Sequence, residues 1–174
     1  MNTIILPLDN HIIRELRAGD EILLSGSMIV GRDAASKKII QIIQSGSLLP
    51  VDFTNQTIIY LGPSPAPPGR VIGSAGPTTA SRMDKLTEPL LNQGLRGMIG
   101  KGKRSNEIIN LIKKYQAVYF TTYGGLAAYL AQKITKYEVI AFPELLAESL
   151  AKIEVNNFPV TVAIDSFGNN IFNK

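Results

Sequence analysis

The chain has 174 residues, 45% of them hydrophobic and 18% charged, which indicates one globular domain over residues 1–174 with enough apolar mass for a packed core. Because it contains no cysteine and a single histidine, it offers no disulfide and no ligand set of its own for zinc or an iron–sulfur cluster. No apolar run approaches the roughly 18 residues of a membrane span. The formal net charge of +4 indicates a slightly basic protein, with a basic site for an anion as the alternative and nucleic acid as a weaker one, since aromatic residues are only 7%.

The N-terminal part alternates strand and helix patterns. Residues 1–10 lack the basic-then-apolar order of a signal peptide, so a cytoplasmic protein is expected. Residues 21–30 predict a strand with a Ser-Gly-Ser interruption, because Ile22, Leu24, Met28 and Val30 fall on one parity. Asp33 caps a predicted helix over residues 33–44, whose apolar residues recur at helical spacing, and Gly46 stands where a C-terminal glycine belongs.

A proline-rich connector comes next. Residues 57–61 predict a short strand, and the four prolines within residues 62–69 then remove backbone donors and fix φ. We interpret this connector as a stiff loop within one domain, with a linker between two lobes as the alternative. Beyond it, Thr78 or Thr79 opens a helical stretch that Pro89 interrupts.

The C-terminal part continues the alternation. The patterns predict strands at residues 95–99, 117–121, 152–155 and 160–165, helices at residues 105–115 and 125–134, and a hairpin end at residues 167–172. Strands that alternate with helices indicate an α/β fold with a mixed or parallel central sheet covered by helices. In open α/β sheets, sites form at the carboxyl ends of the strands.

Three predicted strand-to-helix junctions combine a cation with small or hydroxyl residues. They are Gly31-Arg32-Asp33, the longer Gly73-Ser74-Ala75-Gly76-Pro77-Thr78-Thr79-Ala80-Ser81-Arg82, and Gly100-Lys101-Gly102-Lys103-Arg104-Ser105. Glycines allow close backbone approach, a helix N-terminus favours an anion, and an arginine can fork onto a carboxylate. Taken singly, the three also fit a surface ion pair, a capped turn and a basic turn. Their recurrence predicts a pocket for a small di- or tricarboxylate.

This pocket is half of an active site. It has cations and hydroxyls, but no carboxylate pair, no Ser-His-Asp set and no general base of suitable pKa. The third junction departs from the Walker pattern, which needs a four-residue spacer and a Lys-Ser/Thr ending. A non-catalytic anion- or nucleotide-binding module therefore stays open as an alternative to an enzyme.

Motifs across nearly the whole chain resemble those of one family and follow its order. They are Leu16-Arg17-Ala18-Gly19-Asp20, Leu24-Ser25-Gly26, Gly31-Arg32-Asp33-Ala34-Ala35, Gly73-Ser74-Ala75-Gly76-Pro77-Thr78-Thr79 with Arg82-Met83-Asp84, Gly100-Lys101-Gly102, Phe158-Pro159-Val160 and Ile164-Asp165. The chain thereby resembles the C-terminal domain of class I fumarases and the beta subunit of L-tartrate dehydratases. The resemblance implies a swivelling β/α domain, here as a separate polypeptide.

The same resemblance implies chemistry that this chain would perform only with a partner. It implies a hydro-lyase whose [4Fe–4S] cluster is held by three cysteines of an alpha subunit, in an α2β2 assembly, with the open iron acting as a Lewis acid on the substrate. The expected reaction is the reversible hydration of fumarate to malate. Dehydration of L-tartrate, or the hydration of a methylfumarate, is the alternative.

The resemblance also assigns site residues by position. Substrate carboxylates are expected to bind Arg32, Arg82 and Lys101. Thr78 matches the proposed catalytic base, with Thr79 beside it. An isolated alkoxide is far too basic to exist at neutral pH. The ionised form of Thr78 would therefore have to be favoured by nearby cations, by a helix N-terminus and by the exclusion of water. The chain departs from several relatives at Ser36, where they have histidine, and at Lys103, where asparagine is common.

Overall fold

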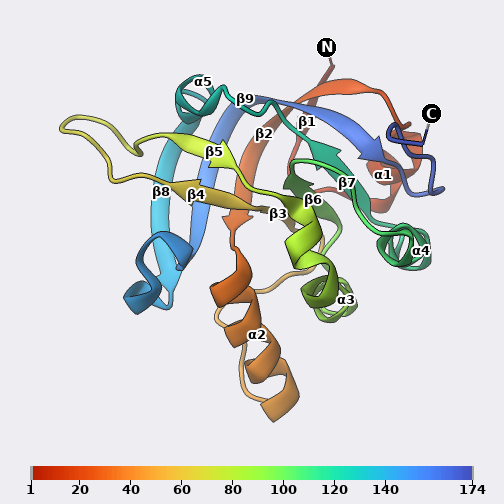
Figure 1. Ribbon diagram of the computed structural model, residues 1–174, viewed down its shortest axis with the longest axis horizontal. Helices are drawn as coiled ribbons and strands as arrows, with labels where there is room; N and C mark the ends of the chain where they lie inside the picture. The colour runs from red at the N-terminus through yellow and green to blue at the C-terminus, as the bar shows by residue number, and fades with distance from the viewer. Residues whose placement is uncertain (1, 174) are drawn as a thin grey trace.

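The computed structural model describes residues 2–173, in which the main sheet closes on itself (Figure 1). Its strands are β1 (Asn2–Ile5), β2 (Glu21–Val30), β3 (Thr57–Ile59), β6 (Gly97–Gly100), β7 (Val118–Thr121), β8 (Ile134–Ala141) and β9 (Leu150–Ile164). Their order is β1-β2-β3-β6-β7-β9-β8, and β9 pairs with β2 as well. The strands β2, β3, β6 and β7 run parallel, whereas β9 is antiparallel to its neighbours. The predicted α/β fold with a mixed central sheet is confirmed.

The strand β9 closes a ring of five strands, β2, β3, β6, β7 and β9. Thr161 pairs with Thr121 of β7 and also with Glu21 of β2. The prediction of two separate strands at residues 152–155 and 160–165 is therefore wrong. The break that the sequence shows between them is an irregularity in one long strand, where Asn157 has a φ of 51°.

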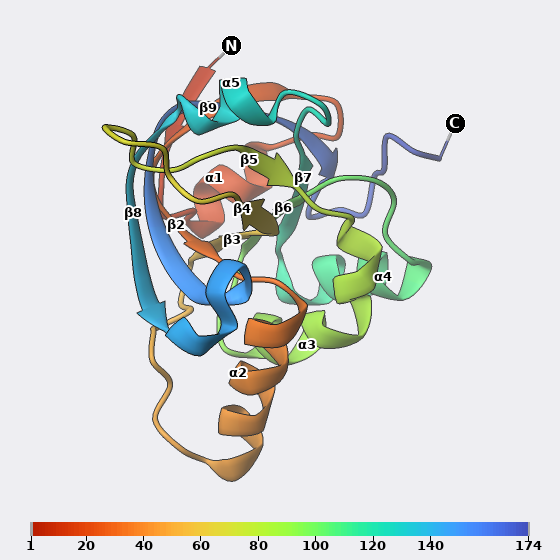
Figure 2. The ribbon, with the colours of Figure 1, turned by 60° about the vertical axis from the view of Figure 1, so that its left-hand side comes forward.

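Helices cover the ring from two sides. They are α1 (Asn10–Glu15), α2 (Asp33–Ser45), α3 (Asp84–Asn92), α4 (Asn106–Tyr115) and α5 (Ala127–Ala131), with 3-10 turns η1 (Ala80–Met83) and η2 (Pro143–Glu148). Figures 1 and 2 show α2 and α3 at the lower end of the molecule and α5 at the opposite end. Two predicted caps form: Ser105 accepts the N–H of Ile108 at 3.4 Å, and Gly46 ends α2 with a φ of 68°. The predicted cap at Asp33 is wrong, because Asp33 is the first residue of α2 and the N-cap residue is Arg32, whose side chain makes no capping hydrogen bond.

The alternation of side chains along the strands separates two hydrophobic clusters. One cluster receives residues from every strand of the ring, including Leu24, Ile59, Ile99, Phe120 and Val162. The other receives their sequence neighbours on the opposite face and the buried faces of three helices, including Ile29, Ile58, Met98, Ala163, Ile39, Leu90 and Ile112. The first cluster thus fills the ring, and the second fixes α2, α3 and α4 against its outer face.

A small ribbon continues from the end of β3. It consists of β4 (Leu61–Pro63) and β5 (Ala75–Pro77), which pair antiparallel, with Gly62 opposite Gly76. The proline-rich segment lies in this ribbon and in the loop beyond it, which protrudes at the left of Figure 1. The strand predicted at residues 57–61 is accordingly divided at Tyr60 between two sheets.

Two helix predictions need correction. The helix expected at residues 125–134 ends at Ala131, because the chain then enters β8, which pairs antiparallel with β9. Pro89 does not interrupt its helix: α3 continues through it, and the N–H of Gln93 donates to the Pro89 carbonyl at 3.3 Å. Within residues 2–173, no helix has the length and apolarity that a membrane crossing requires.

Candidate functional site

The three junctions singled out in the sequence meet at one end of the ring. Arg32 follows β2 and Lys101 follows β6, at the carboxyl ends of two parallel strands. The sequence suggested that the junction of Thr78 follows a strand of the main sheet. In the structure this junction follows β5, which belongs to the ribbon. Main-chain hydrogen bonds join the pieces: the Thr78 N–H donates to the Tyr60 carbonyl at 2.8 Å, and the Lys101 N–H donates to the Thr78 carbonyl at 3.1 Å.

The side chain of Arg32 lies against the ribbon at Gly62. A Cβ atom built on Gly62 would lie 2.6 Å from Nη1 of Arg32 and 3.8 Å from the Thr78 methyl carbon, so the guanidinium group occupies the space that a larger residue at position 62 would fill. The Arg32 side chain is 19% exposed, and its Nη2 lies 3.5 Å from Oε1 of Glu148. Within the described chain its buried Nε has no acceptor, so this guanidinium keeps unused hydrogen-bonding capacity.

Arg82 approaches the same helix terminus from the other junction. Its Nη2 lies 3.4 Å from Oδ2 of Asp33, the first residue of α2. The Arg82 side chain is 50% exposed, so this ion pair adds little stability and leaves the guanidinium available to a ligand. Both arginines therefore lie beside the start of α2, each with one carboxylate nearby.

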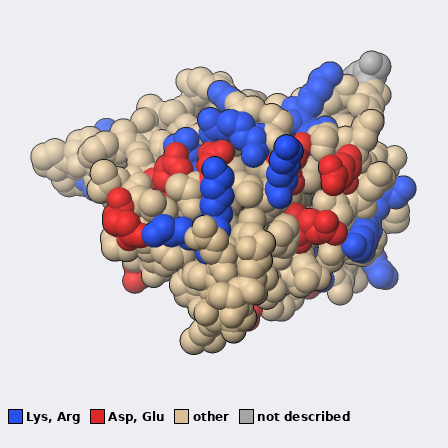
Figure 3. Space-filling view, turned by 60° about the horizontal axis from the view of Figure 1, so that its bottom comes forward, with Lys and Arg blue, Asp and Glu red and all other residues tan. Residues whose placement is uncertain are grey.

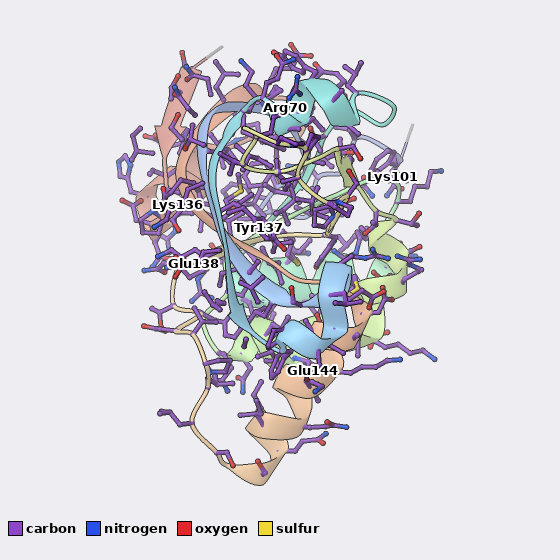
Figure 4. The ribbon with its side chains drawn as sticks, turned by 90° about the vertical axis from the view of Figure 1, so that its left-hand side faces the viewer. Arg70, Lys101, Lys136, Tyr137, Glu138 and Glu144 are labelled. Carbon is purple, nitrogen blue, oxygen red and sulfur yellow. The ribbon has the colours of Figure 1, made fainter. Side chains whose placement is uncertain are left out.

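The two threonines differ in their surroundings. Thr78 is partly buried, and its hydroxyl donates to the Tyr60 carbonyl at 3.2 Å. Thr79 is exposed and forms a bridge with Lys101, which places these residues side by side. Lys101 is also exposed, and Figure 4 shows it at the edge of the molecule. The structure thus brings together Arg32, Thr78, Thr79, Arg82 and Lys101 at one surface.

A buried ion pair holds the second and third junctions in register. Nε of Arg104 lies 2.5 Å from Oδ1 of Asp84, and the other carboxylate oxygen accepts the N–H of Ser105 at 3.0 Å. The Arg104 guanidinium also lies 5.2 Å from the ring centroid of Tyr119 and donates to Thr87 at 2.7 Å. Burial alone would lower the pKa of Arg104, but the neighbouring tyrosines and Asp84 raise it, so the group stays charged.

Arg104 is thus a structural residue within a loop that the sequence describes only as basic. The pairing partner, Asp84, follows Arg82-Met83 in the second junction, 20 residues earlier in the chain. The spacing of the two motifs in the sequence does not predict this contact. The contact explains why the two motifs act as one unit: the arginine of one junction fixes the loop that presents Lys101.

The surface around this cluster is open and carries charges of both signs. Figure 3 shows basic and acidic side chains interleaved on the face below the ring. An apolar hollow of about 550 Å³ lies elsewhere and is lined by Pro65, Val71 and Tyr137, among others. In residues 2–173 no three His, Cys, Asp or Glu side chains gather as metal ligands, and the chain has no cysteine. These residues do not fit an iron–sulfur cluster.

Residues 3–174 match the family described as Fumarase C-terminus, and the chain belongs to that family. It is 41% identical over 151 residues to the anaerobic class I fumarate hydratase of Escherichia coli K12, an alignment that covers 86% of this chain and 28% of the enzyme. It is 38% identical over 158 residues to fumarate hydratase 2 of Leishmania major, covering 90% of this chain and 28% of that protein.

A third relative is closer in length. The Methanocaldococcus jannaschii protein provisionally named L(+)-tartrate dehydratase subunit beta is 34% identical over 166 residues, which covers 92% of this chain and 85% of that protein. The chain therefore spans less than a third of the fumarate hydratases that it matches, but most of a beta subunit. The predicted resemblance to both groups is confirmed.

Proposed function

We propose that this chain is the beta-type subunit of a [4Fe–4S]-dependent hydro-lyase that hydrates fumarate reversibly to malate. The observation that carries the proposal is the gathering of Arg32, Thr78, Arg82 and Lys101 at one end of the ring. Support also comes from 41% identity to a class I fumarate hydratase over 86% of the chain. The cytoplasmic location expected from the sequence stays a prediction.

The cations supply the affinity for a dicarboxylate. Arg32 and Arg82 both border the first turn of α2, which adds the positive end of the helix dipole. Each guanidinium group can donate charge-assisted hydrogen bonds to a carboxylate. Lys101, on the neighbouring loop, adds a third positive charge without a fixed direction. Two substrate carboxylates can therefore be bound at separate cations.

Thr78 is the group that we propose takes the proton from the carbon beside a substrate carboxylate. Its hydroxyl donates to the Tyr60 carbonyl at 3.2 Å, which fixes the direction of the oxygen. Arg32 lies against the same ribbon, and a positive charge there favours the ionised threonine, which is the form that can take a proton. Exclusion of water by a second chain would strengthen this effect.

The proposal requires a partner chain. This chain has no cysteine, so the cysteines of an alpha subunit must hold the cluster. Thr79, Arg82 and Lys101 are exposed, which fits a site that a second chain completes. We place the two kinds of subunit in an α2β2 assembly, as the resemblance implies.

Tartrate dehydration is the second candidate reaction. It is favoured by one observation: the M. jannaschii relative named for that activity is covered to 85% of its length. Both substrates are C4 dicarboxylates, so the same cations would serve either. The choice between them depends on activity measurements with both substrates.

Replacement of Arg82 tests the carboxylate-binding role. Arg82→Ala in the enzyme assembled with its alpha subunit should lower kcat/KM by about 100-fold or more, because a charge-assisted pair to the substrate is lost. The matched control is Lys85→Ala, which removes an exposed cation from the first turn of α3. Near-wild-type rates for Arg82→Ala, or an equal loss in Lys85→Ala, would remove the carboxylate-binding role.

A further inference from the structure

Glu148 joins the candidate site from a segment that the sequence motifs do not include. It is the last residue of η2, and its carboxylate makes two contacts at the start of α2. Oε1 lies 3.5 Å from Nη2 of Arg32, and Oε2 accepts the N–H of Ala34 at 3.0 Å. Ala34 is 114 residues away in the chain, so this contact exists only in the folded protein.

The carboxylate completes a helix terminus that lacks its own cap. The N-cap residue of α2 is Arg32, whose side chain makes no capping hydrogen bond. A helix leaves its first N–H groups without partners, and a nearby anion also interacts favourably with the helix dipole. Glu148 therefore has a reason to stay at this terminus that is independent of Arg32.

We infer that Glu148 is a positioning residue: it holds Nη2 of Arg32 at the start of α2 and thereby keeps Nη1 beside Thr78 for the substrate carboxylate. The identity of the substrate in this inference rests on the proposed function, whereas the contacts of Glu148 with Arg32 and Ala34 are independent of it. With Nη2 engaged by Glu148 and Nη1 lying over Gly62, two points of the guanidinium plane are fixed. The buried Nε is a third point that does not lie on the line joining the other two, so the plane of the guanidinium group has one orientation toward a ligand.

The segment that carries Glu148 is itself attached to α2. Lys38 of α2 pairs with Glu144 of η2, and this hydrogen bond lowers the pKa of Glu144. Figure 4 shows Glu144 where η2 lies against α2. The two carboxylates of η2 thus contact the same helix, but only Glu148 contacts a residue of the candidate site. Glu144 is therefore a matched control.

The kinetic test compares Glu148→Gln with Glu144→Gln in the assembled enzyme. Gln at 148 can still accept the N–H of Ala34, but it has no charge to hold Arg32. We expect KM for the dicarboxylate to rise about tenfold in Glu148→Gln with kcat changed far less, since the arginine binds substrate and transition state alike. Glu144→Gln should leave both constants unchanged. A purely structural role would alter thermal stability in both variants without the change in KM.

A second measurement on the full chain alone separates this inference from the proposed function. In 15N–1H NMR spectra, the Arg32 Nε–H group should have a high heteronuclear NOE in the wild type and in Glu144→Gln, and a lowered one in Glu148→Gln. If the wild-type assembly has no hydro-lyase activity, the proposed function fails and the NMR comparison alone decides the inference. An unchanged NOE overturns the positioning role. A fall in KM for Glu148→Gln also overturns it, because Glu148 would then compete with the substrate for Arg32.

Discussion

A single methyl group added at Gly62 should displace Arg32 without disturbing the fold. The Cβ of Gly62→Ala would lie 2.6 Å from Nη1 of Arg32, closer than atoms in ordinary contact. Alanine tolerates the backbone here, since Gly62 is not among the residues with a positive φ. The obstructed atom is the end of a flexible side chain, so the guanidinium group moves and the ribbon stays.

The size of the effect follows from that distance. Restoring contact at about 3.5–4.0 Å requires Nη1 to move by roughly 1 Å. A misplacement of about 1 Å in a binding or catalytic group can cost around 100-fold in rate, and a hydrogen bond to a charged group contributes about 1.5–3 kcal/mol. We therefore expect kcat/KM for the dicarboxylate to fall about 10- to 100-fold, with a change in unfolding free energy below about 0.5 kcal/mol.

The assay is the hydration of fumarate by the enzyme assembled without oxygen, with urea denaturation of the chain as the measure of stability. Gly76→Ala is the matched control, because Gly76 pairs with Gly62 across the ribbon and its added Cβ would lie 3.5 Å from Ala127 Cβ, an ordinary contact. Unchanged kinetics in Gly62→Ala would refute the placement of Arg32 in the site. An equal loss in Gly76→Ala would mean that the ribbon, and not Arg32, had been disturbed.

Three further changes test the packing that supports the site. Arg104→Met should destabilise the chain by about 3–5 kcal/mol in urea denaturation, because it leaves the Asp84 carboxylate, only 16% exposed, without its partner. Lys114→Met, which breaks an exposed pair, should cost far less, and an equal loss would contradict the role of Arg104. Gly97→Ala should cost about 1–3 kcal/mol, since its Cβ would lie 2.3 Å from Thr57 Oγ1, and unchanged stability would contradict that packing. Burial raises the pKa of Tyr119 above its ordinary value of 10.0, so its contribution to stability is complete below pH 10 and is lost as the pH rises further. The difference in unfolding free energy between wild type and Tyr119→Phe should therefore shrink above pH 10. A constant difference would contradict the raised pKa of Tyr119.

The sequence alone predicts the parts of the fold that local chemistry decides. The helix over residues 33–45 ends as predicted, because Gly46 adopts the left-handed conformation expected there, whereas its start lacks the predicted Asp33 cap. The strand at residues 21–30 has the predicted bounds, because the apolar residues of one parity, such as Leu24, Met28 and Val30, are buried on both sides of the Ser-Gly-Ser interruption. Arg32 and Lys101 lie at carboxyl ends of parallel strands, where the topology rule for α/β sheets had placed them.

The remainder depends on contacts between distant segments. The closing pair of Glu21 with Thr161 joins opposite ends of the chain, and no local pattern specifies such a pair. The strand β8 escaped prediction because it is an edge strand with mostly exposed residues, among them Lys136 and Glu138, so it lacks a clear apolar alternation. Glu148 also gives no signal in the sequence, because its partner Arg32 is remote along the chain.

The most direct test is to co-express this chain with a cysteine-containing alpha subunit, purify the proteins without oxygen, and assay malate, fumarate and tartrate against the chain alone. We predict activity only in the mixture, lost on exposure to air, and the preferred substrate will then decide between the two candidate reactions. Failure of the chains to co-purify, with no activity while the partner retains an intact cluster, would contradict the proposal and show that the arginine and threonine loops bind another anion.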